Sequence, residues 1–70
     1  MVVYVLTVAD RDGVFMASCY PTEEEAKADA SYRFGDYGLC DWHKSAAGIS
    51  RAPILDFEGR AIITPTTLDN

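Results

Sequence analysis

Residues 2–9 form a nearly continuous run of β-branched and other apolar residues, a composition typical of a β-strand. In an extended backbone, alternate side chains point to opposite faces, and here both faces are largely apolar. We therefore expect a central strand, or a strand whose outer face meets a partner. The two faces are Tyr4, Leu6 and Val8 on one side, and Val3, Val5 and Thr7 on the other.

The polar residues Asp10 and Asp12 followed by Gly13 interrupt this pattern, and apolar residues return over residues 14–20. Asp and Gly are typical of tight turns between antiparallel strands. The first part of the chain is therefore predicted to be a β-hairpin.

The pattern changes to helix-forming residues after Pro21, which cannot donate a ladder hydrogen bond and so ends the second strand. Thr22 and Glu25 have the spacing of a capping box, in which each side chain bonds to the backbone amide of the other residue. The spacing predicts a helix over residues 23–34, with Gly35 as the first residue beyond its end.

One stripe of this helix is apolar, because Ala26, Ala30 and Phe34 recur every four residues. The two alanines allow the helix to approach a sheet closely, and Phe34 fills a wider gap at the far end. We expect the helix to lie on the sheet along this stripe.

The remaining residues predict further strands. Residues 39–44 could add a third strand, which the pattern leaves open, and residues 45–53 have the composition of a loop. Residues 54–57 and 60–64 flank Glu58 and Gly59, which favours a second hairpin. The interpretation is a single α+β domain over residues 1–64, with one helix packed on one face of an antiparallel sheet and a frayed tail over residues 65–70.

Composition restricts the possible partners. The chain has 70 residues, of which 49% are hydrophobic, so it is large enough for one domain that folds alone or as a homodimer. The net charge is −5 and the basic residues are scattered singly, which argues against direct binding to nucleic acid or to an anionic membrane. The first residues lack the pattern of a signal peptide, and two cysteines are too few for a disulfide framework. We therefore expect a cytoplasmic protein.

Cys40 and His43, with Cys19 elsewhere in the chain, are the residues that resemble metal ligands. On a strand, Cys40 and His43 would point to opposite faces, and cysteine is often simply a buried apolar residue. We predict no metal site, no cofactor and no catalytic residue, and hence a protein that is not an enzyme. Two alternatives stay open: a small metal- or thiol-dependent enzyme using these three residues, and a structural subunit that self-assembles through residues 2–9.

Acidic residues are more numerous at the predicted helix start than capping requires. Together with Asp10 and Asp12 of the predicted hairpin turn, they could form a surface that meets a basic protein, even by imitating nucleic-acid phosphates. Tyr37 and Trp42 follow the helix and are predicted to be exposed aromatic contacts. The candidate acidic residues are Asp10, Asp12, Glu23, Glu24, Asp29 and Asp36.

The function predicted from these features is that of a small acidic protein-binding module: an inhibitor, adaptor or modulator that acts by protein–protein contact. A phage-encoded inhibitor of a host nucleic-acid-binding complex is one example of such a protein.

Overall fold

A β-hairpin opens the fold, as the apolar pattern predicted. In the computed structural model, which describes residues 1–69, β1 (Val2–Asp10) and β2 (Gly13–Tyr20) are antiparallel and joined at Arg11 and Asp12. The helix α1 (Glu23–Phe34) follows, and a short 3₁₀ helix, η1 (Gly35–Tyr37), extends it. The remaining strands are β3 (His43–Lys44), β4 (Ser50–Ile54) and β5 (Gly59–Thr67).

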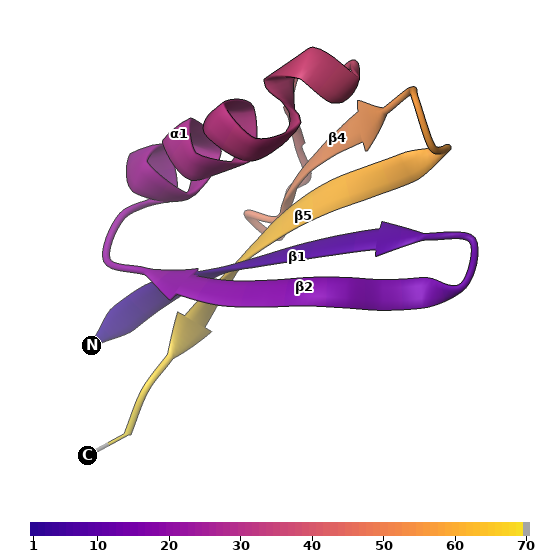
Figure 1. Cartoon of the computed structure of the whole chain (residues 1–70). Coiled ribbons are helices and arrows are strands. Elements are labelled where there is room, and N and C mark those ends of the chain that lie inside the picture. The colour runs from indigo at the N-terminus through magenta and orange to yellow at the C-terminus, as the bar shows by residue number, and fades with distance from the viewer. Residues whose placement is uncertain (70) are drawn as a thin grey trace.

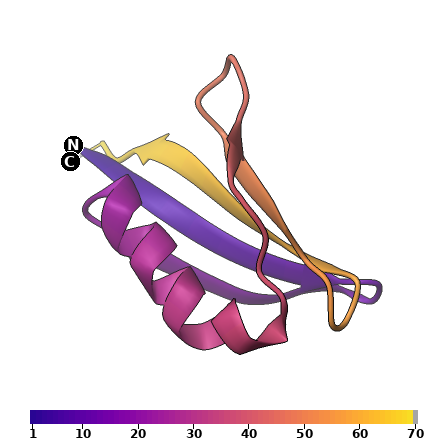
Figure 2. The same cartoon turned by 90° about the horizontal axis from the view of Figure 1, so that it is seen from above.

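The strands form one antiparallel five-stranded sheet in the order β2-β1-β5-β4-β3, with α1 laid across one face (Figures 1 and 2). This architecture confirms the α+β prediction. It also places β1 between two neighbours, as expected for a strand that is apolar on both faces.

The core lies between α1 and the sheet. The fully buried helix residues are Ala26 and Ala30, and they meet Leu6 and Val8 from the predicted inner face of β1. Small side chains on the helix let the two layers approach closely. The other fully buried members of this core are Ile54, Ala61 and Ile63.

The end of α1 differs from the prediction. Gly35 has a right-handed helical backbone (φ −56°), and the chain continues into η1. The residue that ends η1 is Gly38, whose φ of 85° lies in the left-handed region that favours glycine. The left-handed glycine expected directly after Phe34 is therefore three residues further along.

The second hairpin begins earlier than predicted. Residues 50–53, expected in a loop, belong to β4, and the turn comprises residues 55–58. The Pro53 carbonyl accepts a hydrogen bond from the Cys40 amide at 2.9 Å. In a strand, the N–H and C=O groups of one residue point to the same side. The side on which Pro53 lacks an amide hydrogen is therefore the side of residue 40 and not the side of β5.

The expectation of a frayed tail from residue 65 is wrong for its first three residues. Pro65, Thr66 and Thr67 extend β5 and pair with the first residues of β1. The Leu68 amide also donates to the Met1 carbonyl at 2.8 Å. These residues are ordered because β1 is nine residues long and offers them its backbone; the last tail residue, Asn70, lies outside the described residues.

Residues 39–44 meet β4 at both ends of the segment, but only the last two residues form a strand. His43 and Lys44 form β3 against β4, and Leu39 makes an isolated bridge to Ile54.

No helix within residues 1–69 has the length and apolar character needed to cross a membrane.

Candidate functional site

Four aromatic rings meet where α1 ends. This aromatic cluster comprises Phe15, Phe34, Tyr37 and Phe57. Five of its ring pairs have centroids 5.8–6.3 Å apart, and four of these five pairs are edge-to-face. Edge-to-face contacts match the negative face of one ring to the positive edge of another. The cluster is open to solvent, since Phe15 is 53% exposed and Tyr37 is 50% exposed.

A β-bulge in β2 explains how Phe15 enters the cluster. Val8 pairs with Met16 and Ala9 pairs with Val14, so Phe15 is the extra residue between them. Strict alternation would have placed Phe15 on the face opposite Met16. The bulge instead turns it toward α1, where it meets Phe34 and Phe57.

Three turns converge beside the aromatic cluster. The backbone amides of Leu55 and Asp56 donate to the carbonyls of Gly38 and Tyr37, at 3.1 and 3.0 Å, which ties the β4–β5 turn to η1. The β1–β2 turn joins them through an ion pair of 2.6 Å between Arg11 Nε and Glu58 Oε2. We call this region, residues 10–13, 35–38 and 55–58 with the aromatic cluster, the turn end; it lies at the right of Figure 1.

The turn end combines exposed apolar side chains with negative charge. Leu55 is 66% exposed and adds an aliphatic side chain to the exposed rings of Phe15 and Tyr37. The only base within residues 10–13, 35–38 and 55–58 is Arg11, which is paired with Glu58. The acids of the turn end are Asp10, Asp12, Asp36, Asp56 and Glu58.

Three of the predicted acidic residues, Asp10, Asp12 and Asp36, therefore share this end with Tyr37. Asp10 also has a local role, because its side chain accepts the Asp12 amide at 2.8 Å and so stabilises the hairpin turn. Asp12 and Asp36 are exposed.

Glu23 lies at the other end of α1 and is bonded within the chain. Its carboxylate accepts hydrogen bonds from Lys44 Nζ and from the hydroxyl of Ser50, both at 2.9 Å. Ser50 is fully buried, so this carboxylate satisfies a polar group that water cannot reach. The Lys44 bond, followed by the Ser50 bond, lowers the pKa of Glu23.

Glu24 is exposed and lines an open hollow of about 330 Å³ at the start of α1. The residues that line it are Tyr4, Pro21, Thr22, Glu23 and Glu24.

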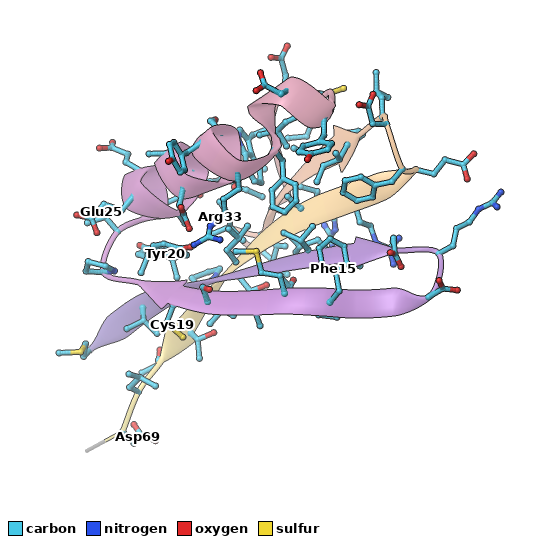
Figure 3. The ribbon with its side chains drawn as sticks, viewed as in Figure 1. Phe15, Cys19, Tyr20, Glu25, Arg33 and Asp69 are labelled. Atoms are coloured by element: carbon cyan, nitrogen blue, oxygen red, sulfur yellow. The ribbon has the colours of Figure 1, made fainter. Side chains whose placement is uncertain are left out.

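Asp29 is also bonded within the chain, in a network between α1 and β2. It accepts a hydrogen bond from the Tyr20 hydroxyl and, on both carboxylate oxygens, from Arg33 Nε at 3.1 Å. Figure 3 shows Tyr20 and Arg33 close together between the helix and the strand. The Tyr20 bond lowers the pKa of Asp29, and burial followed by the bond to Asp29 raises the pKa of Tyr20.

Trp42 is less exposed than predicted. It is partly buried against the core, and Lys27 Nζ lies 6.0 Å from its ring centroid, a distance typical of a cation–π contact. Its indole therefore serves the packing of residues 39–42 beside α1, whereas Tyr37 is available at the surface.

The residues that resembled metal ligands are not brought together. Cys19 lies on β2 and His43 on β3, the two opposite edges of the sheet, so roughly 19 Å of strand spacing separates them. Cys40 is near β4, with its thiol donating to the Gly38 carbonyl at 3.5 Å. Across residues 1–69, no three His, Cys, Asp or Glu side chains are grouped so that they could hold a metal ion.

Comparison with known proteins gives no relative from which a role can be transferred: no family model, curated protein or solved structure matches this chain. The turn end is therefore the candidate site on its geometry alone. The sequence had indicated Asp10, Asp12, Asp36 and Tyr37 as candidate residues but gave no signal for Phe15, Leu55 and Phe57.

Proposed function

We propose that this chain is a small acidic module that binds another protein through the turn end. The observation that carries the proposal is the exposure of Phe15, Tyr37 and Leu55 beside turns that contain five acidic residues. Aromatic side chains surrounded by polar groups are typical of the residues that dominate binding energy at protein interfaces. Buried area at the centre would supply affinity, and the acids at the rim would select a partner with a basic surface.

The rigidity of the turn end favours the same use. Backbone hydrogen bonds hold the β4–β5 turn against η1, so these two segments should lose little conformational entropy on binding. The edge-to-face contacts of Phe15 and Tyr37 with Phe57 keep both exposed rings in place. Both cysteines are free thiols, which fits action in a reducing compartment such as the cytoplasm.

Quantitative affinity capture from a cell lysate tests the proposal. The N-terminus lies at the left of Figure 1, opposite the turn end, so an N-terminal tag leaves the site open. The turn-end variant is Tyr37→Ala with Asp36→Lys. Its matched control is Tyr32→Ala with Glu24→Lys, which makes the same chemical changes at residues outside the turn end; Tyr32 is 89% exposed.

The expected result is a captured protein that the wild type and the control retain equally and that the turn-end variant loses by about tenfold or more, as for a hot-spot residue. Capture should also weaken as salt rises, because exposed charges are screened. Circular dichroism must show that both variants are folded. If the turn-end variant and the control recover the same proteins in equal amounts, the turn end is not the binding site.

A further inference from the structure

The outer edge of β2 is an unprotected strand edge. β2 is the last strand on one side of the sheet, and its eight residues include no charged residue and no proline. Soluble proteins usually protect such edges with charges, proline or very short strands, because the unpaired backbone groups can pair with another chain. The opposite edge has this protection, since β3 has only two residues and one of them is Lys44.

Side chains along β2 are also open to solvent. Val14 is 65% exposed, and Ala17 and Cys19 are exposed on the face without the helix. The right-hand part of β2 forms the lower rim of the sheet in Figure 1, with no strand below it there, and Figure 3 shows Cys19 directed away from α1.

We propose that β2 pairs antiparallel with β2 of a second copy of this chain, giving a dimer with one continuous sheet. Antiparallel pairing of a strand with itself is closed by a two-fold axis and uses up both exposed edges, so assembly stops at two copies. The bulge at Phe15 leaves residues 16–20 as the regular part of β2, and its centre is Ser18. With the axis at Ser18, Ala17 lies opposite Cys19 of the second copy.

The helices leave room for this arrangement. α1 packs over β1 and its two neighbours, so in the dimer three strand spacings separate the two copies of the helix. At roughly 4.8 Å per strand, the helix axes are about 14 Å apart, beyond the 8–10 Å of packed helices. The two copies therefore do not collide above the joined strands.

Charge favours a second copy at this edge. The chain has a net charge of −5, so two copies repel each other over most of their surface, but β2 brings no carboxylate to the contact. On β2, Phe15 contacts Phe34 of α1, and the Tyr20 hydroxyl bonds to Asp29 of α1. Ser18 lies between these two strand residues, so a two-fold axis at Ser18 passes beside the part of α1 between Asp29 and Phe34. Arg33, which is half-exposed and paired with Asp29 of its own chain, therefore lies on the side of α1 that faces the second copy.

Sedimentation equilibrium and amide hydrogen exchange, each measured over a range of protein concentrations, test the dimer. We expect a concentration-dependent dimer in which the outward-facing amides of residues 16–20 become protected as the dimer forms. Ala17→Lys should weaken dimerisation by about tenfold or more, because it places two like charges roughly 7–8 Å apart beside the axis. Thr64→Lys, at a position on the same sheet face but two strands inward, should dimerise like the wild type.

Cysteine cross-linking tests the register. In a Cys40→Ser background, Ala17→Cys should form a covalent dimer on mild oxidation, because residue 17 lies opposite Cys19 of the second copy. Val14→Cys, which has no opposite cysteine in this register, should not cross-link above the level of the background protein.

Three results would overturn the proposal: a monomer at every concentration with fast-exchanging β2 amides, a dimer lost in Thr64→Lys but not in Ala17→Lys, or growth into larger polymers. The second would indicate packing through the open sheet face, and the third would indicate open-ended pairing. The turn-end variant, Tyr37→Ala with Asp36→Lys, should dimerise normally, so this proposal and the proposed function can fail separately.

Discussion

Replacing Glu23 by alanine should destabilise the fold far more than an ordinary surface substitution. The buried Ser50 hydroxyl would lose its acceptor, and an unsatisfied buried hydroxyl costs about 1–3 kcal/mol. The half-exposed Lys44 would lose an ion pair worth about 0.2–1 kcal/mol, and the helix start would lose a favourable charge worth about 0.3–1 kcal/mol. Because these effects overlap, we expect Glu23→Ala to lower the free energy of unfolding by about 2–3 kcal/mol. For a domain of this size, the melting temperature should fall by roughly 10–20 °C.

Chemical denaturation of a double-mutant cycle measures this coupling. Ser50→Ala removes the hydroxyl together with its bond and should cost only about 0.5–1.5 kcal/mol, since Glu23 keeps Lys44. The double variant should lower the free energy of unfolding no more than Glu23→Ala alone does, because it contains no buried hydroxyl without an acceptor. Glu24→Ala is the matched control, because Glu24 is an exposed neighbour whose replacement should change the free energy of unfolding little. If Glu23→Ala lowers the free energy of unfolding no more than Glu24→Ala, or if the effects of Glu23→Ala and Ser50→Ala simply add, the bond between Glu23 and Ser50 does not stabilise the fold as described.

Three further predictions concern pH, close packing and helix capping. Since the pKa of Glu23 is lowered in the folded state, its contribution is present above the ordinary glutamate pKa and is lost as the pH falls through the folded-state pKa. The difference in unfolding free energy between the wild type and Glu23→Gln should therefore shrink in acid. Gly59→Ala should cost about 1–3 kcal/mol, because its Cβ would lie 2.1 Å from the Phe57 ring, whereas Gly35→Ala meets nothing within 4 Å and should be tolerated; equal melting curves would contradict this. Thr22→Ala removes the acceptor of the Glu25 amide and should cost about 0.5–2 kcal/mol, and an unchanged thermal melt would show that the cap is dispensable.

Local sequence signals predicted the elements whose stability is itself local. The helix begins where the capping box indicated, with the Glu25 amide donating to the Thr22 hydroxyl at 3.1 Å. The inner face of β1 also follows from simple alternation, since Leu6 and Val8 are fully buried. In both cases, the local sequence indicates where the element begins or which face is buried, although β1 also depends on its long-range pairing with β5.

Residues 50–53 of β4 were missed because the burial of this strand depends on a distant residue. Its inward positions are Ser50, Ala52 and Ile54, a weak apolar pattern that Pro53 interrupts further. Ser50 can be buried only because Glu23, 27 residues away, accepts its hydroxyl. Nothing within the segment itself indicates that partner.

The candidate site was predictable only in part, for the same reason. Asp36 and Tyr37 are adjacent in the chain, so their joint exposure could be expected. Glu23 and Asp29 looked equally available, yet each is bonded to side chains from another element. Phe15 joins the site through a bulge, and alternation alone would have sent it to the opposite face.

The position of β5 has a consequence for how the chain folds. The first and last strands are neighbours in the centre of the sheet, where Val2 pairs with Thr67, so the main pairing joins residues that are far apart in the chain. During synthesis, the β1–β2 hairpin and α1 can form early, but β1 gains its second neighbour only when β5 has left the ribosome. Such long-range pairing is slow to form, and until then the apolar faces of the first hairpin remain accessible to other chains. Folding should therefore be completed after β5 is made, and the chain is most vulnerable to aggregation in the interval before that strand is inserted.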